Sequence, residues 1–364
     1  MLRRPKFVNF MSIQSGDYLH LRASMTLNQR SHFDLLEELN RNISELVPAR
    51  PIQNLGLLSS HVFSLKLHGF NESDEEVFIK IVDSDQFGNF NVKIPLESDE
   101  SISRIIAYET KYHDGIELFL GVFFPIKIKT PKQIVISDFD KTLVDTKYSS
   151  LKEVYQSLKN PIQFFPPVKV SIDLLNQQLE KGHQPFIVSA SPHFYEKPIR
   201  DWLYQNNIYT SNIFLKDYRT IFSLFQGELA TKDIKSQGFY KFNTIVNILL
   251  MTGIPDDLVL MGDGFESDTI IYLALASILV GRYDPRAIWN NVKREESFRL
   301  NAEQNIKFLS KIFLLKNHSE SHKRGSLKIY IRCNSPAMME KLESRVFNVD
   351  FANQLKHLVT YYVG

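Results

Sequence analysis

Acidic side chains follow two apolar segments of the chain, in a pattern suited to metal-assisted phosphoryl transfer. Asp138 and Asp140 come directly after the apolar segment Ile134–Ser137, and Asp263 and Asp268 follow a second such segment. Carboxylates beside buried segments are costly unless a cation or a chemical task requires them. One carboxylate can attack phosphorus and form an aspartyl-phosphate, while a second protonates the leaving oxygen and then activates water.

The same chemistry needs a cation and groups that hold the phosphoryl oxygens. An anionic nucleophile and an anionic phosphate repel each other, so we expect Mg²⁺, which favours carboxylate, carbonyl and water oxygens. Ser189 ends a third apolar segment, and Lys241 precedes a predicted helix. Both side chains can bind phosphoryl oxygens in the transition state. Lys216 and Lys235 are alternatives to Lys241, and Ser191 is expected to be structural.

Short apolar segments alternate with amphipathic ones from residue 131 onwards, which predicts an α/β domain with a parallel sheet and helices on both faces. In such sheets the ligand site lies beyond the carboxyl ends of the strands. The predicted strands are Ile134–Ser137, Phe186–Ser189, Ile213–Leu215, Leu258–Met261 and Ile329–Ile331. The predicted helices are Leu174–Glu180, Pro198–Gln205, Phe242–Thr252 and Ile270–Leu275.

Residues 59–130 alternate apolar and polar side chains with a period of two, which predicts a small antiparallel β-sandwich. Val77–Val82 and Phe90–Ile94 flank a turn-rich loop that we interpret as a hairpin. Acids at the first and third positions of this loop give it a superficial likeness to a calcium loop. Ile94 stands where such a loop needs a bidentate Glu, so a turn is favoured.

The remaining chain divides into three further parts. We expect 1–58 to be an N-terminal extension with one helix, which begins at Ser31 and ends before Pro48. Residues 131–335 form the predicted catalytic domain, with an insertion at about 285–325, and 336–364 form a helical tail.

Composition narrows the class of protein. The 364 residues carry 43 Lys plus Arg and 41 Asp plus Glu, a net charge of +2, which excludes a globally basic nucleic-acid binder. The single cysteine, Cys333, cannot form an internal disulfide, and no chemical role is expected for it. The start of the chain has no apolar run of signal-peptide length, and Ile270–Val280 is too short to span a bilayer. We expect a cytoplasmic protein, a location compatible with peripheral membrane contact.

The four motifs together resemble the haloacid-dehalogenase phosphatases. They are Asp138-Phe139-Asp140-Lys141-Thr142, then Ser189, then Lys241, then Gly262-Asp263 followed by Asp268. This resemblance implies a three-layer Rossmann-like domain with the motifs at the strand ends.

A narrower resemblance, over roughly residues 60–335, is to the catalytic domain of the actin-patch-associated phosphatidate phosphatases. It is carried by the preceding strand-rich region and by Val135–Thr142, Phe186–Pro192, Phe214–Asp217 and Ile329–Arg332. The resemblance implies Mg²⁺-dependent conversion of phosphatidate to diacylglycerol.

Roles carried over from the family fall on matching positions. Asp138 would be the nucleophile and Asp140 the general acid and base, with Ser189 and Lys241 binding the phosphoryl group. Asp138, the Asp140 carbonyl and Asp263 would hold Mg²⁺, supported by Asp268, for which Glu266 is the alternative. Asp145 needs no catalytic role.

The sequence departs from the narrower family at two places. Lys141 stands where Asp is common, and Gly264–Ser267 replaces a Ser-Gly-Gln segment. These departures bear on the substrate more than on the reaction.

Substrate selection is expected to involve the region after the first motif. Lys147–Lys159 and Lys197 are suited to an anionic headgroup and membrane surface, and Phe164 and Phe165 to acyl chains. A solvated basic helix with a buried aromatic pair explains these residues equally well. We expect phosphatidate as the leading substrate and a soluble phosphomonoester as the second. The alternative to an enzyme is a non-catalytic lipid- or protein-binding adaptor.

Overall fold

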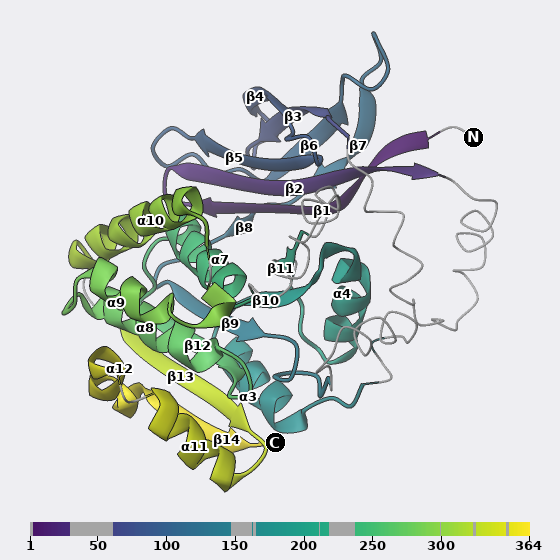
Figure 1. Ribbon diagram of the computed structural model, residues 1–364. Coiled ribbons are helices and arrows are strands. Elements are labelled where there is room, and N and C mark those ends of the chain that lie inside the picture. The colour runs from purple at the N-terminus through teal and green to yellow at the C-terminus, as the bar shows by residue number, and fades with distance from the viewer. Residues whose placement is uncertain are drawn as a thin grey trace.

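A computed structural model describes residues 3–29, 61–146, 162, 165–210, 212–217, 237–298, 300–322, 325–346 and 349–364. These residues form one parallel six-stranded sheet flanked by helices and, beside it, two smaller four-stranded sheets (Figure 1). The predicted combination of an α/β unit with a β-rich unit is therefore confirmed at the level of fold class. Within the described residues, no helix is long and apolar enough to cross a membrane.

The large sheet has the strand order β11-β10-β9-β12-β13-β14, and every neighbouring pair is parallel. Its strands are β9 (Gln133–Asp138), β10 (Gln184–Pro192), β11 (Ile213–Lys216), β12 (Asp257–Asp263), β13 (Ser326–Cys333) and β14 (Val359–Val363). The chain moves outward from β9 to β11 and then returns to place β12 on the other side of β9. The strand order therefore reverses between β9 and β12. In open α/β sheets, ligands bind beyond the carboxyl ends of the strands at such a reversal.

Alternating side chains of the strands supply two separate cores, one on each face of the sheet. Ile134 and Ile136 point to one face, and Val135 points to the other. The first face is covered by α7 (Gln237–Thr252), α8 (Asp268–Val280), α9 (Pro285–Val292), α10 (Ala302–Glu320), α11 (Pro336–Val346) and α12 (Asp350–Gln354). The second is covered by α3 (Lys169–Glu180) and α4 (Glu196–Gln205). The three-layer arrangement therefore follows from the period-two pattern of the strands.

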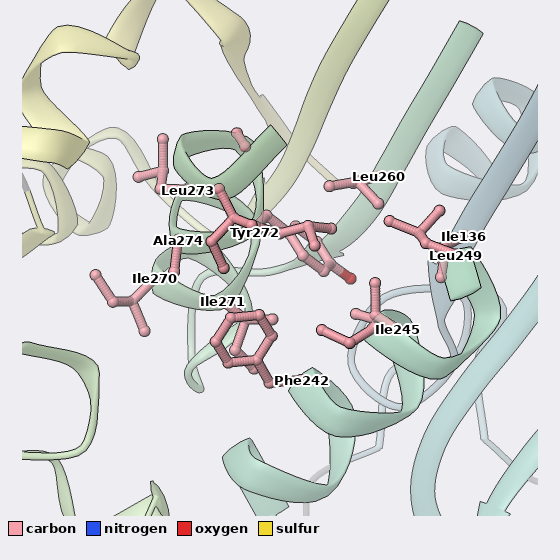
Figure 2. Close-up of a cluster of buried hydrophobic side chains, with 14 of the residues drawn as sticks. Ile136, Phe242, Ile245, Leu249, Leu260, Ile270, Ile271, Tyr272, Leu273 and Ala274 are labelled. Atoms are coloured by element: carbon pink, nitrogen blue, oxygen red, sulfur yellow. The ribbon is translucent and has the colours of Figure 1, made fainter. Parts of the chain in front are cut away.

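Helix α8 lies at the centre of the first core. Figure 2 shows Ile271 of α8 beside Phe242 of α7, and Tyr272 directed toward the strands that carry Ile136 and Leu260. The Tyr272 hydroxyl donates a hydrogen bond of 2.9 Å to the carbonyl of Met261, which satisfies its one polar atom in this apolar setting. A helix that is apolar all round is buried on all sides, which explains the long apolar run in this part of the sequence.

The two small sheets pack face to face around a third core and form a sandwich. One has the order β4-β3-β6-β7, all antiparallel, and the other has the order β5-β2-β1-β8, with β1 and β8 parallel. The strands are β1 (Arg3–Ser15), β2 (Tyr18–Gln29), β3 (Ser64–Phe70), β4 (Glu76–Asp83), β5 (Asn89–Pro95), β6 (Arg104–Glu109), β7 (Leu118–Phe123) and β8 (Ile126–Lys127).

Residues 3–29 are a correction to the expected N-terminal extension. They form the long antiparallel pair β1 and β2, which supplies the middle of one sandwich sheet. The helix expected after Ser31 lies outside the described residues. The register of β1 shifts between Phe7 and Asn9, and this bulge breaks the alternation that would mark a strand in the sequence.

The loop before Asn89 is also different from the expected hairpin. Strands β4 and β5 belong to different sheets, so the loop crosses the edge of the sandwich instead of joining paired strands. Its shape is held by Asp85, whose Oδ1 accepts hydrogen bonds from the backbone N–H groups of Phe87 and Asn89 at 2.9 and 2.8 Å. The carboxylate thus organises a turn, as we expected for this loop.

The C-terminal tail contains a strand as well as helices. After α11 and α12, β14 pairs in parallel with β13 and completes the large sheet. The polar stretch expected as an insertion contains α10, which packs through Phe308, Ile312 and Leu315 onto the first core. Both segments are therefore part of the α/β unit that carries the site.

Strand β1 connects the sandwich to the α/β unit. Its Met11 and Ile13 belong to the same buried cluster as Ile134 and Phe242. The Ser15 hydroxyl donates to the carbonyl of Thr252 at the end of α7, at 2.7 Å. The two units therefore share part of one core.

Candidate functional site

The predicted site residues come together at the carboxyl ends of the parallel strands. Asp138 is the last residue of β9 and Asp263 the last of β12, the two neighbouring strands between which the strand order reverses. Ser189 lies near the end of β10, Asp268 begins α8, and Lys241 lies near the start of α7. Five residues from four separate parts of the sequence thus lie at one edge of the sheet.

Lys241 is the centre of a buried charge cluster. Its Nζ lies 2.9 Å from Asp138 Oδ1, 2.8 Å from Asp268 Oδ1 and 3.4 Å from Glu266 Oε2. Of the two alternative lysines, Lys216 lies in β11, which β10 separates from β9, and Lys235 lies outside the described residues. The geometry therefore favours Lys241 as the lysine of this site.

The three aspartates of the cluster hold protons more tightly than ordinary carboxyls do, whereas the effect of burial on Glu266 is outweighed by Lys241 and Lys141, which lower its pKa to about 2. Burial raises the pKa of Asp138, and the nearby Asp268 and Asp263 raise it further against the opposing effect of Lys241. Burial and Asp268 raise the pKa of Asp263 to about 7, again against Lys241. Burial also raises the pKa of Asp268. Several carboxylates in one buried site repel each other, so the cluster favours the arrival of a cation.

Lys241 responds in the opposite direction. Burial alone would lower the pKa of its ammonium group, but Asp138 and Asp268 outweigh burial and hold the pKa well above the usual value. Lys241 is therefore charged throughout the physiological pH range. A permanently charged ammonium group beside Asp138 is suited to binding an anion there.

Asp263 leaves one oxygen free in a position suited to a metal ligand. Its Oδ1 accepts hydrogen bonds from the N–H groups of Phe265 and Glu266 at 2.6 and 2.8 Å. Its Oδ2 is buried and accepts no hydrogen bond from a described residue. Carboxylate oxygens of Asp138, Asp263 and Asp268 lie within 4.8 Å of one another, which fits the oxygen ligands that Mg²⁺ prefers.

The glycines on either side of Asp263 are closely packed. A Cβ on Gly262 would lie 2.6 Å from Asp268 Oδ2, and one on Gly264 would lie 2.9 Å from Leu342 Cδ2. Gly262 therefore lets the end of β12 pass close to α8, whereas a side chain at Gly264 would require the flexible end of Leu342 to move. The approach of β12 to α8 brings the Asp263 N–H to 3.3 Å from Asp268 Oδ2.

Asp140 faces a set of hydroxyl groups instead of the charged cluster. Its Oδ2 accepts hydrogen bonds from Ser189 Oγ at 2.7 Å and Ser191 Oγ at 2.8 Å, and its Oδ1 accepts one from Thr146 Oγ1 at 3.4 Å. The Ser189 Oγ in turn accepts a hydrogen bond of 2.9 Å from the Ser191 N–H. Ser189 therefore orients Asp140 in this structure, and Ser191, which we expected to be structural, shares that contact.

Three residues that were not predicted to belong to the site, Lys141, Thr142 and Arg332, also contact its residues. Thr142 Oγ1 donates to Asp138 Oδ2 at 3.1 Å, and Lys141 Nζ lies 2.9 Å from Glu266 Oε1. Arg332, at the end of β13, donates to the Lys141 carbonyl at 2.6 Å and to Asp145 Oδ1 at 3.1 Å. Thr142 and Arg332 belong to the motifs quoted for the family resemblance, but nothing in their spacing indicated these contacts.

The residues expected to select the substrate are mostly beyond what the structure describes. Lys147–Lys159 and Phe164 lie outside the described residues. Phe165 is half-buried against the core on the α3 and α4 face, and Lys197 is exposed on α4. The role expected for them stays a prediction.

Comparison with known families supports the resemblance found in the sequence. Residues 133–283 match the family model described as "Phosphatidate phosphatase APP1, catalytic domain". The matched segment runs from β9 to just beyond α8 and contains Asp138, Asp140, Ser189 and Lys241 as well as the acids after β12. The match agrees with the family suspected from the sequence, over a segment that is less than half of the chain. No curated protein matched the chain.

Solved structures of bacterial β-glucuronidases show only a distant likeness. A calcium-binding mutant of Bacteroides uniformis β-glucuronidase 2 is 9% identical with a TM-score of 0.24, over 93% of this chain and 35% of that one. Ruminococcus gnavus β-glucuronidase in complex with a C6-substituted uronic isofagomine is 7% identical with a TM-score of 0.24, over 100% and 62% of the two chains. The chain thus spans less than two thirds of the length of either structure, and similarity this low carries no argument.

Proposed function

We propose that the protein is a Mg²⁺-dependent phosphohydrolase that cleaves a phosphate monoester through an aspartyl-phosphate at Asp138. The observation that carries the proposal is the contact of Lys241 with Asp138 and Asp268 at the strand ends of a segment that matches a phosphatase family. The strand order, which reverses between β9 and β12, further supports a haloacid-dehalogenase-like catalytic domain.

Mg²⁺ fits the acids of the site. Asp138, Asp263 and Asp268 would hold it together with the Asp140 carbonyl, and Asp263 Oδ2, to which no described residue donates a hydrogen bond, supplies one of the oxygens. When bound, the cation would neutralise the repulsion between the carboxylates and an anionic phosphate. Asp268 is favoured over Glu266 as the supporting acid because it belongs to this group of three.

The first chemical step belongs to Asp138 and Asp140. A carboxylate oxygen of Asp138 attacks phosphorus, and the bond between phosphorus and the alcohol oxygen breaks as Asp140 gives its proton to that oxygen. Thr142 and Lys241 hold the two oxygens of Asp138 in place from opposite sides. Lys241 also lies where it can bind a phosphoryl oxygen as charge shifts in the transition state.

The second step releases phosphate. Asp140, now ionised, removes a proton from a water molecule, which attacks the phosphoryl group and breaks its bond to Asp138. Ser189 and Ser191 keep the Asp140 carboxylate oriented for both proton transfers. Ser189 is also the hydroxyl that we assign to phosphoryl binding, once substrate displaces its contact with Asp140.

Phosphatidate is the substrate that the matched family favours, with diacylglycerol as the alcohol product. A lipid substrate requires access to a membrane surface, so we propose a cytoplasmic enzyme with peripheral membrane contact. A soluble phosphomonoester is the second candidate, because Lys141 and Glu266 depart from the family pattern beside the chemistry. A non-catalytic adaptor is disfavoured because Asp138, Asp140 and Lys241 are all in contact with partners that catalysis would use.

Phosphate release from phosphatidate in mixed micelles, compared with a panel of sugar and nucleotide phosphates, tests this proposal. Each substrate is measured with Mg²⁺ and with a chelator, using the wild type and Asp138→Asn. We expect Mg²⁺-dependent release that favours phosphatidate and is lost in the variant. Preference for a soluble ester would move the assignment to the second candidate. An inactive wild type that binds anionic liposomes would favour the adaptor.

A further inference from the structure

Lys141 and Glu266 form an ion pair beside the buried cluster. Lys141 Nζ lies 2.9 Å from Glu266 Oε1, and the two side chains are 21% and 26% exposed, whereas those of Lys241, Asp138 and Asp268 are 5% exposed or less. The pair therefore lies between solvent and the charged cluster. The two positions belong to the two places where the sequence departs from the family pattern, so these departures are in contact with each other.

The backbone of Lys141 is fixed independently of its side chain. Its φ angle is +58°, in the left-handed region that few non-glycine residues adopt. Its carbonyl accepts a hydrogen bond of 2.6 Å from Arg332, and the next residue, Thr142, is tied to Asp138. A flexible four-carbon side chain thus extends from a rigid base beside the nucleophile.

Glu266 makes the contacts that an oxyanion would make at this place. One of its carboxylate oxygens lies 2.9 Å from Lys141 Nζ, and the other lies 3.4 Å from Lys241 Nζ. Two ammonium groups from separate elements thus converge on one anionic group. Lys241 is the cation that we assign to phosphoryl binding, so an anion that reaches Lys241 arrives within the range of Lys141 as well.

We propose that Lys141 is a second phosphate-binding cation of the site and that Glu266 holds it in place until the phosphate group of a monoester replaces the Glu266 carboxylate. This inference rests on the proposed phosphatase function and adds a residue that would contact the substrate. The described site contains the acids Asp138, Asp140, Asp263, Glu266 and Asp268 but only two lysines within contact of them, Lys141 and Lys241. A dianionic phosphate therefore gains from a second ammonium group that can turn toward it.

Equilibrium binding of inorganic phosphate in the presence of Mg²⁺, measured by isothermal titration calorimetry, tests the inference without turnover. We expect Lys141→Gln to weaken binding about 10-fold, as loss of one charge-assisted contact does. Lys141→Arg should stay within about 3-fold of the wild type because it keeps the charge. Glu266→Gln should bind phosphate at least as tightly as the wild type, because the competing carboxylate is gone. Lys181→Met, an exposed lysine after the far end of α3, is the matched control and should bind as the wild type does.

Two results would overturn the inference. If Lys141→Gln binds phosphate as tightly as the wild type, Lys141 does not contact the anion. If Glu266→Gln weakens binding as much as Lys141→Gln, the pair serves only to hold the loop together. Thermal melting of each variant establishes that it is folded. If Lys141→Gln does not fold, the comparison of Lys141→Arg and Glu266→Gln with the wild type still tests the inference.

Kinetics separate this inference from the proposed function. With a hydrolysed phosphomonoester, Lys141→Gln should raise KM more than it lowers kcat, because its contact forms when substrate binds. If the wild type hydrolyses phosphate monoesters but its affinity for phosphate does not depend on Lys141, the inference is wrong and the proposed function stands. If phosphate binding depends on Lys141 but no ester is hydrolysed, the function fails and the anion site stands.

Discussion

Lys241 Nζ lies 2.9 Å from Asp138 Oδ1, which makes a lysine of α7 and the last residue of β9 a buried ion pair. Lys241→Met would leave Asp138, Asp263 and Asp268 in one buried site without this cation. Removing one partner of a buried ion pair costs about 3–5 kcal/mol. We therefore expect the free energy of unfolding, measured in urea with a chelator present, to fall by about 3 kcal/mol.

The same variant should lose catalysis by at least about 100-fold, since the group that stabilises phosphoryl charge is missing. Mg²⁺ should restore part of the lost stability, because it supplies positive charge near the acids in place of the Lys241 ammonium group. It should not restore the activity. Lys181→Met serves again as the control. If Lys241→Met unfolds with the same urea midpoint as the wild type, the ion pair does not stabilise the fold as we predict.

Asp140→Asn should separate the two chemical steps. An asparagine cannot protonate the leaving oxygen, and general acid catalysis contributes about 10²–10⁴-fold, so hydrolysis of an alkyl phosphate should fall by that factor. The p-nitrophenolate ion leaves without a proton, so the first step with p-nitrophenyl phosphate should survive. Stopped-flow absorbance should then show a burst of one p-nitrophenolate per enzyme, followed by slow turnover. Loss of the burst, with the fold intact, would assign Asp140 to a different task.

The stabilising effect of Mg²⁺ should increase with pH. Burial and Asp268 raise the pKa of Asp263 from its ordinary value of 3.8 to about 7, so the folded protein binds this proton more tightly than the unfolded chain does. The stability from this group is present below the unfolded pKa and is lost as pH rises toward 7. Mg²⁺ binds the ionised carboxylate, so it competes with the proton at low pH.

Melting temperatures at pH 6, 7 and 8, with and without MgCl₂, measure this effect. The increase caused by Mg²⁺ should be larger at pH 8 than at pH 6, and Asp263→Asn should remove most of the difference. An increase that is the same at all three pH values, or larger at pH 6, would exclude Asp263 as a titrating metal ligand.

The β-sandwich should not be separable from the catalytic unit. Strand β1 contributes Met11 and Ile13 to the core under α7, and Asn89 Nδ2 donates to Asp217 Oδ2 at 2.8 Å, just after β11. A chain that lacks residues 1–128 would expose that core, so we expect it to aggregate or to melt well below the full chain. Asn89→Ala removes the hydrogen bond to Asp217 between the units together with the side-chain contacts of Asn89 with Ser24 and Asp85 inside the sandwich. At about 1 kcal/mol for each hydrogen bond, it should still cost less stability than the truncation. A truncated chain that melts cooperatively at the full-length temperature would show that the units are independent.

The sequence was sufficient for the features that depend on local pattern. Apolar runs such as those before Asp138 and Asp263 can be strands buried on both faces, and acids at their ends mark the carboxyl edge of a parallel sheet. The structure places strands at both runs. The acids that meet there were predicted for the same reason, whereas the choice of Lys241 over Lys216 and Lys235 depended on its match to the family motifs.

Other features depend on partners that are distant in sequence. The bulge between Phe7 and Asn9 interrupts the alternating pattern by which β1 could have been predicted. The prediction of a helical tail overlooked the β-branched and aromatic residues of β14. The loop before Asn89 has the residues of a hairpin turn, but its flanking strands pair with β2 and β3. The contact of Lys141 with Glu266 joins two loops 125 residues apart, and no local pattern encodes it.

Chemical trapping of the phosphorylated residue is the most direct test of the account. Asp140→Asn is mixed with p-nitrophenyl phosphate and Mg²⁺, quenched in acid after the first turnover, digested, and mapped by mass spectrometry, with Asp138→Asn as the control. We predict a phosphoryl adduct on Asp138, on about one site per enzyme, that is absent from the control. Release of p-nitrophenolate with no adduct, or with the adduct on another residue, would contradict the account.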